Sequence, residues 1–228
     1  MTYNVHGLRS GIRTVGRAIR AQEPDVVVLQ ESGGRLPLLR MGAVLGMQVA
    51  GDPVSFPRRR VKNAVLVRLP WRLRAHRFHR FAGGARLYPR GVLIAEISDG
   101  SRWFTVASVH LGLRPAERMR HAVRLEERVL AAAQEGSAVI GGDLNEFEDG
   151  RAVGLLAERF DDAWPRAQAA GNAEGSGATF PSWSPSARID YVFASRDLAV
   201  RAARVPSDPT TARASDHLPV VVEIDRTA

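Results

Sequence analysis

A run of consecutive strand patterns occupies the middle of this 228-residue chain, between two regions in which strands and helices alternate. Strict alternation along the whole chain would indicate a doubly wound parallel sheet, and the central run excludes that architecture. Consecutive strands favour antiparallel pairing, with helices covering the outer faces of the sheets. The sequence therefore predicts the α+β class.

The individual elements follow from hydrophobic periodicity. Alternation of apolar and basic residues predicts a half-buried strand over residues 71–76, with a slip of the pattern near Arg77. Short apolar runs predict strands at residues 26–29, 64–67, 92–95, 104–109, 138–140, 189–193 and 220–222. Helical spacing predicts helices at residues 12–22 and 115–136, with weaker patterns at 36–45 and 152–160. We find no internal repeat and expect one domain over residues 1–228.

Composition removes several function classes. The chain has no cysteine, which excludes disulfides, cysteine–zinc sites and thiol nucleophiles. It contains neither a phosphate-binding GxxxxGK[ST] loop nor a GxSxG nucleophile elbow. No apolar run approaches the ~20 residues that span a bilayer, and residues 1–4 do not begin a signal peptide. We expect a cytoplasmic protein as written, and a secreted or membrane-anchored one if the true start lies upstream of Met1.

Positive charge is concentrated in one segment. Between Asp52 and Glu96 the chain has no acidic residue, whereas it has Lys62 and ten arginines there, Arg90 among them. A strongly basic segment on a slightly acidic body indicates a polyanionic partner, which is nucleic acid, a phosphorylated small molecule or an anionic membrane. The alternative is that these arginines are solvated strand and loop residues.

Polar residues follow or precede the apolar strands at their ends. Because an antiparallel sheet places the start of one strand beside the end of its neighbour, these groups can meet on one rim. Each has an ordinary structural reading as well, such as an Asx turn, a helix cap, an ion pair or a surface position. The residues at strand ends are Asn4, Glu31, His110, Asp143, Asn145, Asp190, Asp216 and His217.

Several carboxylates on one rim repel each other unless a cation neutralises them. A ligand set rich in oxygen, without cysteine or an HExxH pair, favours Mg²⁺ or Mn²⁺ over zinc. Mg²⁺ commonly combines one or two carboxylates with phosphate oxygens of a substrate. The residues therefore indicate metal-assisted attack of water on a phosphoester.

Seven sequence blocks resemble the endonuclease/exonuclease/phosphatase (DNase I-like) superfamily, in the order in which that superfamily carries them. Together they cover essentially the whole chain, and they are specific for the superfamily but not for a substrate. The blocks are TYNVHG at residues 2–7, LQE at 29–31, NAVL at 63–66, VHL at 109–111, GGDLN at 141–145, RIDYVF at 188–193 and SDHLPV at 215–220.

The resemblance implies a fold and a metal site. The fold would be a four-layer α/β/β/α sandwich of two mostly antiparallel sheets flanked by helices. Glu31 matches the metal-binding glutamate of the superfamily, and Asn4 matches the asparagine that supports the metal's ligands. Asp216 matches an acid that often lies near a second metal position. The implied cofactor is Mg²⁺ or Mn²⁺.

The resemblance also implies catalytic roles. Asp143 matches the aspartate that orients and deprotonates the attacking water, and Asn145 matches the asparagine that holds a phosphate oxygen. Asp190 matches the acid that hydrogen-bonds the last histidine, and His217 matches that histidine, which stabilises charge in the transition state. His110 matches a phosphate-contacting histidine; apurinic-site nucleases usually carry tyrosine there, which argues mildly against that branch.

Three functions remain open at the level of sequence. The first is a phosphodiesterase acting on nucleic acid, which the basic segment favours if its arginines border the rim. The second is a hydrolase of phospholipid head groups or inositol phosphates, for which the same arginines would serve. The third is a non-catalytic module that binds polyanions, and it is disfavoured because none of the catalytic residues is missing.

Overall fold

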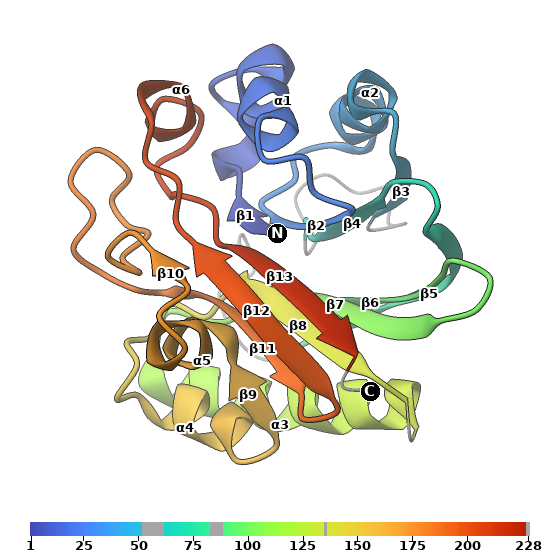
Figure 1. Cartoon of the computed structure of the whole chain (residues 1–228), viewed down its shortest axis with the longest axis vertical. Coiled ribbons are helices and arrows are strands. Elements are labelled where there is room, and N and C mark those ends of the chain that lie inside the picture. Colours follow the sequence, from blue (N-terminus) through green and yellow to red (C-terminus); the bar gives the residue numbers. More distant parts are fainter. Residues whose placement is uncertain (52–61, 83–88, 135, 227–228) are drawn as a thin grey trace.

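A computed structural model describes residues 1–51, 62–82, 89–134 and 136–226 of the chain. Within these ranges two β-layers lie against each other, and helices cover the outside of both (Figure 1). Of the basic segment, Arg58, Arg59, Arg60 and Arg86 lie outside the described residues. One outer layer contains α1 (Ile12–Arg20), α2 (Arg35–Leu45) and α6 (Pro209–Ala212), and the other contains α3 (Pro115–Ala133), α4 (Arg151–Ala157) and α5 (Ala163–Ala169).

The first β-layer is built from two sheets that meet at Thr2. Thr2 forms an antiparallel bridge with Val220, which joins the two sheets edge to edge. One sheet has the order β1 (Thr2–Asn4), β2 (Val26–Gln30), β4 (Ala64–Val67) and β3 (Gln48–Gly51). The other has the order β10 (Ala173–Glu174), β12 (Leu198–Arg204) and β13 (Val221–Arg226).

The second β-layer is a single six-stranded sheet. Its β7 and β8 are parallel, and its other neighbouring strands are antiparallel. With the parallel pairs β1–β2 and β10–β12, three of the ten strand pairings described are parallel and seven antiparallel. The strand order is β5 (Arg72–Arg80), β6 (Gly91–Ser98), β7 (Trp103–His110), β8 (Ala138–Asp143), β11 (Asp190–Ser195) and β9 (Phe160–Asp162).

Alternating side chains of β2 show how the layers pack. Val28 lies in the core between the two β-layers, with Val65 and Leu93. Val27 and Leu29 point the other way, into the core beneath α1 and α2. This period of two is the one expected of a strand covered on both faces. The predicted α/β/β/α sandwich of mostly antiparallel sheets is therefore confirmed.

The basic edge strand differs in detail from its sequence pattern. β5 extends to Arg80, and its register against β6 shifts between Leu73 and Ala75. The sequence predicted a break in the pattern near Arg77, and that position was wrong. The pairing of β5 with β6 shifts instead near the C-terminal end of β6. Phe78 packs on the core between the layers. Among the described residues, no helix combines the length and the apolar character needed to cross a membrane.

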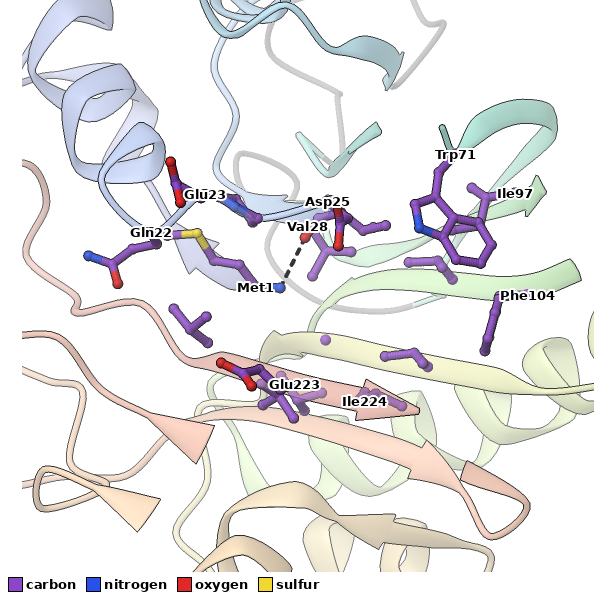
Figure 2. Close-up of a pocket in the computed structure, with 18 of the residues that line it drawn as sticks. Met1, Gln22, Glu23, Asp25, Val28, Trp71, Ile97, Phe104, Glu223 and Ile224 are labelled. Carbon is purple, nitrogen blue, oxygen red and sulfur yellow. Dashed lines mark hydrogen bonds between the residues drawn. The ribbon is translucent and has the colours of Figure 1, made fainter. Parts of the chain in front are cut away.

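A cavity of about 580 Å³ opens between the two β-layers beside the start of β1 (Figure 2). Val28, Trp71 and Phe104 line its apolar part, and at one wall the amino group of Met1 donates a hydrogen bond of 3.0 Å to the carbonyl of Val26. None of the eight candidate site residues lines this cavity. The candidate residues lie instead at the ends of the strands.

Candidate active site

The register of three neighbouring strands places Asp143 between two other candidates. His110, the last residue of β7, is the register partner of Asp143 at the end of β8. Asp190, the first residue of β11, is the register partner of Asp143 on the other side. Because β7 and β8 are parallel and β11 is antiparallel to them, two strand ends and one strand start meet at one edge. The sheet thus assembles the centre of the site.

Asp143 is almost completely enclosed, with 1% of its surface exposed. Its Oδ2 accepts a hydrogen bond of 2.9 Å from Nδ2 of Asn4 and lies 3.2 Å from Nε2 of His110. Its Oδ1 accepts one of 2.9 Å from the backbone N–H of Asn145. Burial alone would raise the pKa of Asp143, but His110, His217 and Asn4 together hold it well below its usual range. This carboxyl group is therefore ionised at neutral pH.

Asp190 and His217 form a second buried pair. Oδ2 of Asp190 lies 2.8 Å from Nδ1 of His217 and accepts a hydrogen bond of 2.6 Å from the hydroxyl of Thr179. The other ring nitrogen of His217, Nε2, lies 3.9 Å from Oδ2 of Asp143. Burial would lower the pKa of His217, but Asp190, Asp143 and Asp216 raise it to about 10. His217 is thus a positively charged donor between two aspartates.

Two candidates adopt left-handed backbone conformations within two residues of the end of their strands. Asn145 has a φ of 51° and Glu31 one of 50°. The backbone of Asn145 is part of an Asx turn, which the side chain of Asp143 closes. The side-chain Nδ2 of Asn145 donates a hydrogen bond of 3.2 Å to the carbonyl of Leu111. At Glu31 the backbone carbonyl accepts a 2.9 Å hydrogen bond from the N–H of Gly7. Asp143 and Asn145 therefore form an Asx turn and can also belong to the active site, so one role does not exclude the other.

Glu31 and Asp216 lie at the more open part of the site. Glu31 is half-buried, and the side chain of Asp216 is 28% exposed. Oδ2 of Asp216 lies 3.3 Å from Nδ1 of His6, and the backbone N–H of His6 donates to the side-chain oxygen of Asn4. His6 therefore links the predicted metal residues Asn4 and Asp216, a connection that the sequence analysis missed.

Arg90 is the principal site residue that the sequence analysis did not single out. Its Nη1 lies 2.7 Å from both ring nitrogens of His110, and its guanidinium interacts electrostatically with Asp143 and Glu31. Arg90 directly precedes β6, whose first residue, Gly91, pairs with His110. That pairing was the missing information, because the sequence showed Arg90 only as one of many arginines.

The donor atoms suit a hard divalent cation. Among the described residues, the side chains of Asp143, Asp190 and His217 each offer one ligand atom within 4.8 Å of the others. Oδ1 of Asp190 is buried and has no hydrogen-bond partner among these residues, so one oxygen of the group is left to interact with a ligand. Glu31, which follows β2 in the other β-layer, adds a further carboxylate that interacts electrostatically with Arg90, as Asp143 does. Oxygen-rich sets of this kind suit Mg²⁺ or Mn²⁺.

Residues 1–217 match the Endonuclease/Exonuclease/phosphatase family, and the chain belongs to it. Members of this family are phosphoesterase hydrolases that depend on a divalent metal, so this protein is an enzyme of that class. The carboxylates of Asp143 and Asp190, which are buried beside the charged His217, agree with a metal-dependent centre. No curated protein matches the chain in sequence.

Solved structures resemble the whole fold at low sequence identity. A mannosyl-6-phosphatase from Bacteroides thetaiotaomicron superposes with a TM-score of 0.84 at 17% identity, covering 98% of both chains. The catalytic domain of human Nocturnin gives 0.75 at 20% identity, with 99% of this chain and 93% of that chain covered. TDP2 of Danio rerio, complexed with a single-strand DNA product, gives 0.79 at 15% identity and covers 98% and 97%. These likenesses establish the fold.

Proposed function

We propose that this enzyme is a Mg²⁺- or Mn²⁺-dependent phosphodiesterase that hydrolyses nucleic acid. The observation that carries the proposal is the enclosed ionised carboxylate of Asp143, which lies between Asn4, His110 and His217. An acceptor for a proton of water therefore adjoins donors that can hold a phosphoryl group.

Asp143 orients the attacking water and accepts its proton as the new O–P bond forms. The bond from phosphorus to the leaving oxygen of the diester breaks, and that oxygen takes a proton from solvent. Its contact with Asn4 and with the backbone of Asn145 fixes the direction of the carboxylate. A fixed direction removes the entropy cost of aligning water with phosphorus during the reaction. Asn4 thereby supports Asp143 as well as the predicted metal site.

His217 and Arg90 stabilise the negative charge that builds up on the phosphoryl oxygens. Asp190 holds the Nδ1 side of His217, which leaves Nε2 to donate toward the phosphate. Arg90 presents a permanent charge beside His110, and Asn145 adds a neutral donor. Donors that are placed before the reaction lower the barrier more than donors that must reorganise.

Glu31 and Asp216, supported by Asn4, would hold the divalent cation. Glu31 and Asp216 are the more accessible carboxylates of the site, so a metal there can also reach substrate oxygens. When bound, the cation supplies positive charge at the phosphoryl oxygens. The alternative ligands are Asp143, Asp190 and His217, but in that group Asp190 and His217 already bind each other at 2.8 Å.

Two arginines of the basic segment favour nucleic acid as the substrate. Arg80 pairs with Gly91 and Gly91 with His110, so Arg80 lies at the catalytic end of the six-stranded sheet, as Arg90 does. Arg72 pairs with Ser98 at the other end. The fold of TDP2 in complex with a single-strand DNA product agrees with this choice of substrate. Phosphate contacts of this kind dominate nucleic-acid affinity.

A second candidate is a hydrolase of a small phosphoester. A mannosyl-6-phosphatase shares the fold, and an inositol phosphate or a phospholipid head group would meet the same arginines. A screen separates the candidates: plasmid, single-stranded DNA, RNA, mannose 6-phosphate, inositol phosphates and sphingomyelin are each incubated with Mg²⁺ or Mn²⁺. Cleavage of DNA or RNA is the expected result. Survival of all three nucleic acids, together with cleavage of a small phosphoester or lipid, would overturn the proposal.

A further inference from the structure

Two of the most exposed apolar side chains of the protein stand on loops that leave the active site. Trp183 is 73% exposed and Phe147 is 59% exposed. Phe147 follows Asn145 by two residues. Trp183 belongs to the loop between β10 and β11, which also carries the Asp190 partner Thr179. Both rings are therefore close in the chain to residues of the site.

The Trp183 loop is fixed to the segment that bears Asp216 and His217. The backbone N–H of Ser182 donates a hydrogen bond of 2.8 Å to the carbonyl of Asp216. The hydroxyl of Ser182 donates one of 2.7 Å to the carbonyl of Ser215. The ring of Phe180 lies 4.9 Å from the ring of His217. The loop thus holds Trp183 beside the active site while leaving its indole in solvent.

Exposure of aromatic rings is rare elsewhere on the described residues. Among their Trp, Tyr and Phe side chains, only Trp103, Phe147 and Trp183 are exposed. The guanidinium of Arg74 lies over the ring of Trp103, 5.7 Å from its centre, and Trp103 begins β7 at the end opposite His110. Isolated exposed apolar residues are ordinary on a protein surface. Two uncovered aromatic rings beside one catalytic centre are not explained in that way.

We propose that Trp183 and Phe147 stack on unpaired bases next to the scissile phosphate, so that the enzyme selects single-stranded over duplex nucleic acid. The inference rests on the proposed nucleic-acid substrate and adds the part of that substrate that the loops recognise. Aromatic platforms accept any base because every base presents a π-face, whereas the faces of bases in a duplex are already stacked.

Arginines near the two rings suit the phosphates that flank a stacked base. Of the two exposed carboxylates that follow Phe147, Glu148 is paired with Arg188, whose Nε lies 2.9 Å from its Oε2, and Asp149 comes after it. Arg114 comes shortly after His110 in the chain, and Arg151 comes shortly after Phe147. Both arginines are exposed, and neither forms an ion pair with another described residue. Such separate positive charges suit a flexible chain of phosphates.

The test compares two substrates of equal charge. One is a single-stranded oligonucleotide, and the other has the same length and the same phosphates but tetrahydrofuran units in place of the bases. We expect wild type to cleave the first with a kcat/KM roughly tenfold higher, as the worth of one or two stacked bases implies. Trp183→Ala should bring that ratio close to one, Trp183→Phe should restore most of it, and the matched control Trp103→Ala should leave it unchanged.

The outcomes separate this inference from the proposed function. If wild type cleaves both oligonucleotides equally, or if Trp183→Ala keeps the tenfold ratio, the stacking role is overturned while the nuclease stands. If wild type cleaves neither oligonucleotide but cleaves plasmid DNA, the stacking role is overturned while the nuclease stands. If plasmid, single-stranded DNA and RNA all survive, both are overturned. If Trp183→Ala instead loses binding to vesicles of phosphatidylcholine and sphingomyelin that wild type binds, the two rings serve a membrane and the inference is wrong.

Discussion

The interior and the mouth of the active site are organised by different principles. In the interior, Asp143, Asp190 and His217 are between 1% and 6% exposed and contact one another or their strand neighbours. At the mouth, Glu31 and Asp216 are partly exposed, and Asp216 faces His6 at 3.3 Å. Sheet register places Asp143 and Asp190 in the interior, and the loop before β13 brings His217 to them. Asp216 of the same loop and Glu31, which follows β2, lie at the mouth. We infer that the interior sets the chemistry and the mouth selects the cation and the substrate.

The difference matters because an electrostatic interaction is stronger where water is excluded. A charge removed from the interior leaves its partners buried and uncompensated. A charge removed from the mouth is partly replaced by water and ions. Substitutions in the interior should therefore abolish turnover on every substrate, and substitutions at the mouth should change metal or substrate preference.

A large effect in the interior is expected for His217→Ala. Loss of the charged donor opposite Asp143 should reduce kcat by about 10²–10⁴-fold, the usual worth of a positioned acid or base. The measurement is metal-dependent hydrolysis of whichever phosphoester the screen identifies, with circular dichroism to verify folding. Asp225→Asn is the surface control, because Asp225 is exposed and, among the described residues, forms an ion pair with exposed Arg201 alone. A folded variant with near-normal turnover would remove His217 from the mechanism.

Arg90→Met should reduce kcat by about 10²-fold, the typical cost of removing one preorganised donor to a developing anion. The guanidinium lies between the interior and the mouth, so this variant tests to which of the two regions Arg90 belongs. Arg124→Met is the control, because Arg124 is exposed and pairs only with Glu127 on the surface of α3. A rise in KM with unchanged kcat would instead assign Arg90 to substrate binding at the mouth.

Glu31→Gln and Asp216→Asn should each weaken binding of Mn²⁺ by about 10–100-fold, since each variant loses one carboxylate of the cation site. Because a ligand of the folded state stabilises it, the increase in Tm on adding Mn²⁺ measures this affinity without reference to activity. Glu127→Gln serves as a control on the surface of α3. If Asp190→Asn abolishes the increase while Glu31→Gln preserves it, the cation belongs in the interior.

The smallest of these effects is expected for Thr179→Val. The variant removes a 2.6 Å hydrogen bond to Asp190 but leaves the contact between Asp190 and His217. We expect a loss of about 1 kcal/mol in the free energy of unfolding, as for a typical buried hydrogen bond. Turnover should fall several-fold, and Thr179→Ser should recover it. A Thr179→Val enzyme with wild-type turnover would show that Asp190 is held without this bond.

The sequence predicted the fold well because its strongest patterns are the buried ones. The apolar runs of β2, β4, β6, β7 and β8 lie between packed layers, where burial enforces the pattern. The sequence analysis missed α5, which contains Pro165 two residues after its start, and β12, whose alanines and arginines show no clear period. Those elements owe their structure to packing against β11 and β13, which the local sequence does not show.

The eight candidate residues came from their positions at the ends of predicted strands, the resemblance supplied their roles, and those roles remain predictions. What the sequence lacked was the pairing of distant segments. Arg90 meets His110 only because β6 starts where β7 ends, and Thr179 meets Asp190 only because the β10–β11 loop folds back. Nothing in the residue types distinguished these two from other arginines and threonines.

The most direct test of the account is turnover by Asp143→Asn in the presence of saturating Mg²⁺ or Mn²⁺. Asparagine has the size of aspartate, and its carbonyl oxygen can still accept the hydrogen bond from the backbone N–H of Asn145, although its amide group cannot accept the bond from Nδ2 of Asn4. The strand pairings of β8 are unchanged, so the fold should persist. The amide cannot take a proton from water, and we predict a loss of at least about 10³-fold in kcat. A folded Asp143→Asn protein that hydrolyses phosphoesters at close to the wild-type rate would contradict the account.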